Sequence, residues 1–86
     1  MFGVNIHNFN SFLMSEKRLA LWEEVIGLLN SVKAQDDIIW VDMSVGRLRI
    51  PFQKPIFEKL RKMIGKKIAI LRTDIKGKEY LLREVS

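Results

Sequence analysis

The sequence of 86 residues lacks cysteine and contains one histidine and two prolines. Without cysteine the chain can form neither a disulfide nor a thiolate metal site, which is typical of proteins from a reducing cytoplasm. His7 has no second histidine to share a metal ion with. We therefore predict a cytoplasmic protein with no metal and no cofactor.

Long hydrophobic runs are also missing. No apolar stretch approaches the ~18–20 residues that a helix needs to cross a bilayer. The first fifteen residues carry no charged side chain, but no basic segment opens them and Asn5, Asn8 and Asn10 interrupt them, so a secretory signal is not expected. A hydrophobic fraction of 48% and a charged fraction of 29% are typical of a globular chain, and this length predicts a single domain.

Acidic residues are scarce in the second half of the chain. Residues 1–43 contain three Lys or Arg against six Asp or Glu, whereas residues 44–86 contain twelve against four, and the whole chain carries a net charge of +5. Such an asymmetry bears on partners rather than on fold. It suits an anionic ligand of the second half, and it equally suits two halves that complement each other between subunits.

The pattern of apolar residues predicts an N-terminal arm and a first helix. Residues 1–13 differ in composition from the rest and form an arm, either loosely attached or docked through the alternating Phe2, Val4 and Ile6. Residues 14–86 form the domain. From Ser15 to about Val32, apolar residues recur at helical spacing over nearly half of the cylinder, which predicts a helix.

The remainder of the chain predicts two hairpins around a second helix. Residues 38–43 and 47–52 read as strands, 53–65 as a helix with proline near its start and glycine past its end, and 67–73 and 78–85 as two further strands. The expected fold is therefore a small single α+β domain of order α-ββ-α-ββ. Its four-stranded, mostly antiparallel sheet would carry two packed helices.

Clustered basic residues are the first candidate site. Lys and Arg gather around the second predicted helix and the strands beside it, and phosphates attract such clusters through counterion release. The alternative is a solvated surface or a charge-paired interface. The candidate nucleic-acid-binding residues are Arg47, Arg49, Lys59, Lys62, Lys66, Lys67, Arg72, Lys76 and Lys78.

A base-stacking surface is the second candidate. Trp40 and Tyr80 could share an outer sheet face with Arg47, Arg49 and Arg72, and aromatic residues interleaved with arginine stack on unpaired bases. The alternative, favoured for Trp40, is that both aromatic residues belong to the core of so small a domain. The two arginines that alternate with Leu48 and Ile50 are expected to face outward.

No residue pattern indicates catalysis. Asp74 and Lys76 resemble the acid-x-Lys element of metal-dependent nucleases only faintly, because they fall in an expected turn without a second acid. The glycines are isolated, so no phosphate-binding loop is present. An enzyme of that type remains the remote alternative.

These patterns together predict a non-enzymatic module that contacts DNA or RNA through its basic second half. The competing hypothesis is a protein-protein interaction or homo-oligomeric assembly protein, with a homodimer formed through the predicted helix around Trp22 to Leu29. Neither a membrane nor a small-molecule substrate is implied. Plentiful Ile, Lys and Glu also indicate a thermophile.

Overall fold

The computed structural model describes residues 16–85. Within them, strands in the order β2-β5-β4-β3-β6-β7 form one six-stranded mixed sheet. β2 runs parallel to β5, and the other pairings are antiparallel. The elements are β2 (Glu16–Lys17), β3 (Glu24–Gln35), β4 (Ile38–Met43), β5 (Gly46–Pro51), α2 (Lys54–Arg61), β6 (Lys67–Arg72) and β7 (Tyr80–Glu84).

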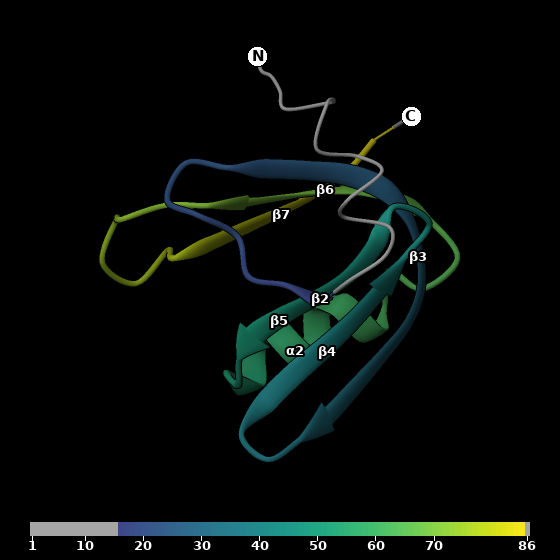
Figure 1. Ribbon diagram of the computed structural model, residues 1–86, viewed down its shortest axis with the longest axis horizontal. Coiled ribbons are helices and arrows are strands. Elements are labelled where there is room, and N and C mark those ends of the chain that lie inside the picture. Colours follow the sequence, from purple (N-terminus) through teal and green to yellow (C-terminus); the bar gives the residue numbers. More distant parts are fainter. Residues whose placement is uncertain (1–15, 86) are drawn as a thin grey trace.

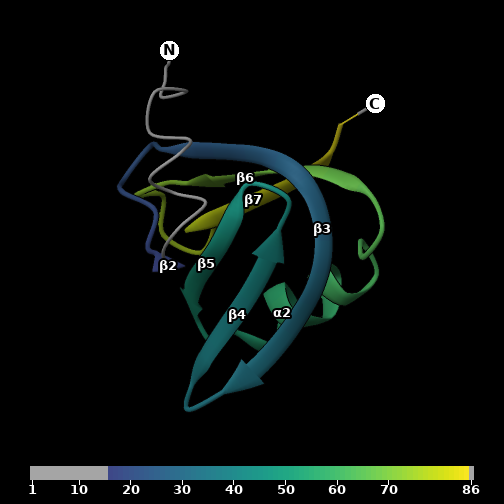
Figure 2. The same ribbon diagram turned by 45° about the vertical axis from the view of Figure 1, so that its right-hand side comes forward.

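Strand β3 joins the two parts of the sheet. Its first half pairs with β6 and its second half with β4, and the register shifts between Leu29 and Ser31. A bulge of this kind bends a strand and increases its twist. Figures 1 and 2 show the result: β3 lies along β6, curves through a wide arc and continues beside β4.

Gly27 lies where the β4–β5 turn crosses β3. A Cβ atom built on Gly27 would lie 2.9 Å from Ser44 Oγ and 3.4 Å from two carbons of Val45. The same serine hydroxyl accepts a hydrogen bond from the Leu28 N–H at 2.9 Å, and Ser44 N donates to the Leu28 carbonyl at 2.8 Å. Glycine is therefore needed for a close approach between the strand and this turn.

The predicted four-stranded sheet with two helices is wrong. Among residues 16–85, α2 is the single helix, and the segment predicted as the first helix forms β2, a turn and β3. Two features make this strand resemble a helix in the sequence. Ile26 and Leu28 make the outer side of β3 apolar as well, and the bulge after Leu29 breaks the alternation that identifies a strand.

The later elements lie close to where the sequence places them. β4 spans the predicted residues 38–43, β5 falls one residue earlier than expected, and α2 lies within the predicted helix 53–65. β6 and β7 form the predicted second hairpin. β5 alternates cleanly, α2 has clear boundaries, and β4 and β6 are short apolar runs bounded by turn residues, which is why local pattern located them. The predicted arm, residues 1–13, lies outside the described residues.

The hydrophobic core lies between the inner face of the sheet and α2. Leu60 is the buried residue of the helix, and Ile56 and Phe57 pack against the core from the same element. No helix among the described residues is long and apolar enough to span a membrane. The fully buried side chains of the core include Leu29, Ile39, Val41, Leu48, Ile50, Leu60, Ile68 and Ile70.

Candidate functional site

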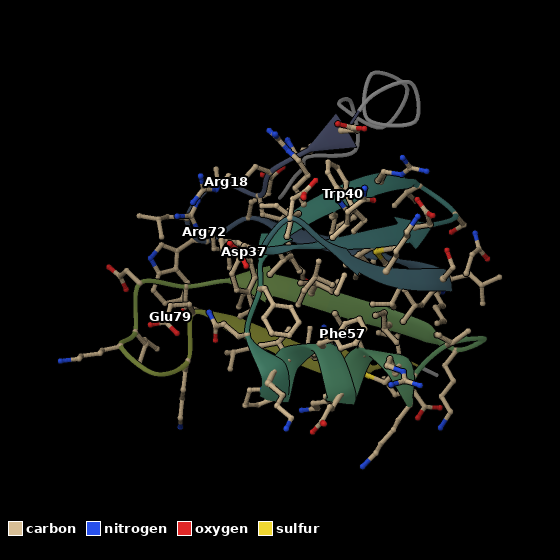
Figure 3. All side chains as sticks on the ribbon, turned by 90° about the horizontal axis from the view of Figure 1, so that it is seen from below. Arg18, Asp37, Trp40, Phe57, Arg72 and Glu79 are labelled. Atoms are coloured by element: carbon tan, nitrogen blue, oxygen red, sulfur yellow. The ribbon has the colours of Figure 1, made fainter. Side chains whose placement is uncertain are left out.

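Trp40 lies on the outer face of the sheet. Successive side chains of a strand point to opposite faces, and the neighbours Ile39 and Val41 are fully buried. Trp40 therefore faces outward, where it is partly exposed. Figure 3 shows it on the side of the molecule away from Phe57 and helix α2.

Two cationic side chains flank this tryptophan. The sheet register pairs Trp40 with Lys33 on β3 and with Arg49 on β5. Residues directly opposite each other on adjacent strands have Cβ atoms about 4.5–5.5 Å apart. Lys33 and Arg49 are exposed, and no ion pair links either to another residue of the described part of the chain. We call Lys33, Trp40 and Arg49 the Trp40 face.

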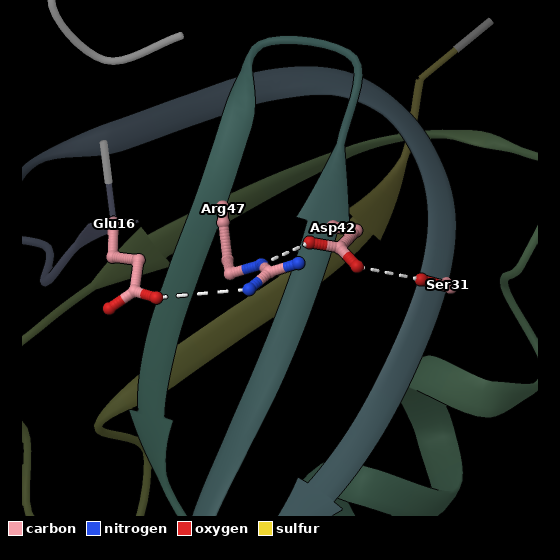
Figure 4. Close-up of polar contacts among 4 residues, drawn as sticks. All are labelled: Glu16, Ser31, Asp42 and Arg47. Carbon is pink, nitrogen blue, oxygen red and sulfur yellow. Dashed lines mark hydrogen bonds and ion pairs between the residues drawn. The ribbon is translucent and has the colours of Figure 1, made fainter. Parts of the chain in front are cut away.

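A chain of polar contacts borders the Trp40 face (Figure 4). Arg47 Nε donates to Asp42 Oδ1 at 2.6 Å, Ser31 Oγ donates to Asp42 Oδ2 at 2.9 Å, and an Arg47 nitrogen lies 3.7 Å from Glu16 Oε2. The chain crosses four neighbouring strands, from β3 to β2. Arg47, a predicted phosphate ligand, is thus matched by two carboxylates.

The same contacts set the ionisation of Asp42. Partial burial acts to raise the pKa of its carboxyl, but the hydrogen bonds from Arg47 and Ser31 and the charge of Arg47 outweigh that effect and hold the pKa below its usual value. The hydrogen bond with Asp42, together with its charge, raises the pKa of Arg47. The pair is charged near neutral pH, so Asp42 does not add an uncompensated negative charge next to the Trp40 face.

Four of the predicted basic residues lie elsewhere, around α2 and the start of β6. Lys59 Nζ donates to the Leu82 carbonyl at 3.4 Å, and Lys66 lies 3.5 Å from a Glu84 carboxylate oxygen. Lys62 follows the helix. Lys67 pairs with Leu28 on β3, five residues before Lys33, which corresponds to about 16 Å along the strand. These lysines do not extend the Trp40 face.

Arg72 and the β6–β7 loop (residues 73–79) form a third location. Arg72 Nη1 donates to the Leu19 carbonyl at 2.7 Å, so part of its guanidinium is already bound. Lys76 and Lys78 are exposed on the loop, which lies at the end of β6 opposite to Lys67. The nine predicted residues are thus divided among three locations on the part of the chain that the structure describes.

The β6–β7 loop itself is well braced. The hydroxyl of Thr73, which is buried, donates to the Lys78 carbonyl at 2.6 Å and accepts from Ile75 N at 3.0 Å. Glu79 accepts a hydrogen bond from Gly77 N at 3.0 Å, and backbone hydrogen bonds from Glu79 itself and from Gly77 hold the pKa of its carboxyl below the usual value. These hydrogen bonds hold the backbone of the loop that carries Lys76 and Lys78 in one conformation.

The core position favoured for Trp40 is wrong, whereas Tyr80, for which the sequence favours neither face, belongs to the core. Tyr80 is buried, at 6% exposure, whereas Trp40 is an outer residue. Lys33 is missing from the predicted site, because it becomes a neighbour of Trp40 only once residues 24–35 form a strand. The alternation of Trp40 with Ile39 and Val41 was the signal that could have located the indole.

Among residues 16–85 no group of three or more His, Cys, Asp or Glu side chains could hold a metal ion. Asp74 is an exposed loop residue. Comparisons with protein families, with curated proteins and with solved structures found no match.

Proposed function

We propose that this protein is a binding module for unpaired DNA or RNA and that the Trp40 face contacts the nucleic acid. The observation that carries the proposal is the register of Trp40, which lies between Lys33 and Arg49 on an outer sheet face. The predicted cytoplasmic location and the absence of catalysis belong to the same proposal.

Each of the three residues has a physical role in such a complex. The indole offers a flat ring on which a base can stack, and base–aromatic stacking contributes about 1–3 kcal/mol per base. The Lys33 ammonium and the Arg49 guanidinium lie where they can neutralise the phosphates on either side of that base. A partly exposed tryptophan between two cations without ion-pair partners among the described residues suits this ligand better than it suits a core.

The connectivity of the sheet supports the same surface. Strands β3, β4 and β5 form a meander, α2 follows, and β6 and β7 form a hairpin whose first strand pairs with β3. This arrangement is similar to that of the OB-fold, in which the face of the second and third strands binds oligonucleotides. Those strands correspond to β4 and β5. Because a fold does not by itself define a function, the residues of the Trp40 face remain the main argument.

Single-stranded nucleic acid suits this surface better than a duplex. Bases inside a duplex are stacked on each other, so an aromatic side chain on an open sheet cannot reach their flat faces, whereas unpaired bases can be splayed onto it. The structure favours neither ribose nor deoxyribose at this surface, so both belong in the test.

The test measures binding of fluorescein-labelled oligothymidylate and oligouridylate by fluorescence anisotropy. Trp40→Ala should weaken binding roughly five- to hundredfold, which is the range for loss of one stacked base. Arg49→Ala and Lys33→Ala should each weaken binding and reduce the slope of its salt dependence by about one ion. A duplex of the same length should bind less tightly than the single strand.

Lys62→Ala and Lys67→Ala are matched controls, because they remove the same charge far from the Trp40 face. They should change affinity much less than Arg49→Ala. If these lysines matter as much as Arg49, the basic surface around α2 is the interface and the Trp40 face is not. If no single-stranded oligonucleotide binds at low salt, the proposal is wrong.

A second candidate function, homo-oligomeric assembly, is favoured by one observation. The outer side of β3, β6 and β7 carries the exposed apolar residues Ile26, Leu28 and Leu81, each at 41–43% exposure. Glu24 and Arg83 on that face lie 3.5 Å apart, and exposed Lys67 lies opposite Leu28 at its edge. An apolar face that carries charges of both signs can pair with itself about a twofold axis, which favours a second copy as its partner and replaces the dimer helix predicted from sequence.

Light scattering after size exclusion tests this assembly. If the face is a subunit contact, the molar mass should be twice that of the 10.1 kDa chain, and Ile26→Lys should return it to the mass of a monomer. Lys76→Ala, on the loop away from the face, should leave it a dimer. A monomeric wild-type protein at high concentration would rule this candidate out.

A further inference from the structure

Trp22 is the most exposed of the large hydrophobic side chains in residues 16–85, at 55% exposure. Glu23 N donates to the Ala20 carbonyl at 3.0 Å, so Ala20–Glu23 is a β-turn with Trp22 at its third position. The φ angle of Trp22 is +64°. Positive φ at this position is normally provided by glycine or asparagine, and for a bulky side chain it is a true outlier.

The backbone around Trp22 is held in this conformation by its neighbours. Trp22 N donates to the Arg72 carbonyl at 2.6 Å, and Arg72 N donates to the Glu23 carbonyl at 3.1 Å. Glu23 also accepts from Ala20 N at 2.8 Å and pairs with Lys17 at 2.9 Å. The fold thus keeps a tryptophan in a strained turn without burying its indole. Strain of this kind concentrates at ligand-binding sites.

The position of Trp22 connects it with the Trp40 face. β2 pairs in parallel with β5, Glu16 beside Arg47 and Lys17 beside Leu48. β2 ends at Lys17, and Arg18 follows it directly in the chain. The Arg72 guanidinium donates a hydrogen bond to the Leu19 carbonyl, and the Arg72 carbonyl accepts one from the backbone N–H of Trp22.

Figure 3 shows Arg18 and Arg72 at the end of the molecule where Glu79 and its loop also lie. That loop carries Lys76 and Lys78, both exposed. Arg18 and Arg72 therefore both belong to the connection between β2 and the Trp22 turn, Arg18 through the chain and Arg72 through its hydrogen bonds with Leu19 and Trp22.

We propose that Trp22 is a second stacking platform for an unpaired base, so that one strand of nucleic acid binds Trp40 and Trp22 and passes the arginines between them. This inference rests on the proposed function of the Trp40 face and extends it to a longer single strand. A stacking role for Trp22 would account for a bulky residue in a turn where glycine would fit without strain. A strand too short to reach both platforms binds only one of them.

The test compares Trp22→Gly with the wild-type chain on oligothymidylates of about 4 and about 12 nucleotides, lengths within the range that one such domain covers. Trp22→Gly should weaken binding of the longer strand roughly five- to hundredfold, as loss of one stacked base does. It should change binding of the shorter strand, held at Trp40, by less than about twofold. Trp22→Phe keeps a ring and should retain most of the affinity. Because glycine relieves the strain, the thermal midpoint should not fall, so lost binding cannot be ascribed to unfolding.

Three results would overturn the inference, and they are distinguishable. If Trp40→Ala weakens binding and Trp22→Gly binds both strands as the wild type does, Trp22 is not a platform although the proposed function stands. If Trp22→Gly instead halves the molar mass in light scattering and leaves binding unchanged, the indole is a subunit contact. If the wild-type chain binds neither strand, the proposed function falls and this inference falls with it.

Discussion

Replacing Gly27 with alanine is expected to destabilise the protein. The new Cβ would lie 2.9 Å from Ser44 Oγ, closer than a carbon and an oxygen can pack, and overpacking of this kind typically costs about 1–3 kcal/mol. Gly27 does not have a positive φ, so alanine is not strained there, and the lower entropy of the unfolded chain returns about 0.4–1 kcal/mol. The net loss in the free energy of unfolding is therefore between about 0 and about 2.6 kcal/mol, with about 1.3 kcal/mol at the centre of the range.

Thermal and urea unfolding, followed by circular dichroism, measure this loss. A domain of this size loses about 4–8 °C in its midpoint for each kcal/mol. The sign is decisive, because in an exposed helix the same substitution would stabilise the protein by about 1 kcal/mol. A rise in the midpoint would contradict the conclusion that residues 24–35 form a strand and that the β4–β5 turn packs against it at Gly27.

Ser44→Ala completes a double-mutant cycle for this contact. Alone it removes the acceptor of the Leu28 N–H bond, at a cost of about 0.5–1.5 kcal/mol. Combined with Gly27→Ala it also removes the oxygen that clashes. The double variant should then lose about 1 kcal/mol less than the two single losses together. If the two single losses simply add in the double variant, the Ser44 oxygen is not the atom that clashes with the new Cβ of Ala at position 27.

Two further predictions concern the polar contacts. Asp42→Asn should lower the free energy of unfolding near pH 7 by about 0.2–1 kcal/mol, the range for exposed ion pairs. Because the pKa of Asp42 is depressed in the folded state, this difference from the wild type should be complete above about pH 4 and should vanish in stronger acid. Urea unfolding at a series of pH values measures it. A difference that persists at pH 2 would argue against the Arg47 pairing. Thr73→Val should cost about 1–3 kcal/mol, because the Lys78 carbonyl and Ile75 N lose their buried partner, whereas Thr73→Ser should be nearly neutral; equal losses for both variants in urea unfolding would mean that the methyl group, not the hydroxyl, braces the loop.

How much the sequence could predict depends on the segment. From Ile38 onward, the chain consists of short apolar or alternating runs separated by turns and of one helical stripe that ends near Gly65. The predicted hairpin, helix and hairpin therefore lie close to their true positions. These elements are local, so a window of ten residues contains the information that specifies them.

The first part of the domain could not be read in the same way. β3 pairs with β4 through one half and with β6 through the other, so the exposure of its side chains depends on partners as distant in sequence as Leu71 is from Glu24. Val25, Gly27 and Leu29 do alternate inward, but Ile26 and Leu28 hide that alternation on the outside. Without β3 as a strand, Lys33 has no relation to Trp40, and the candidate site is reduced to a count of basic residues.

The most direct measurement of the central claim uses the fluorescence of Trp40. The chain has two tryptophans, so Trp22→Phe leaves Trp40 as the only one. Titration of this variant with a short oligothymidylate at low salt should quench the emission of Trp40 in a saturable way, because a stacked base quenches an indole that it contacts. The additional change Arg49→Ala should move the titration to higher concentrations. Saturable binding by anisotropy with no change in Trp40 emission would contradict the account, since the strand would then lie elsewhere on the protein.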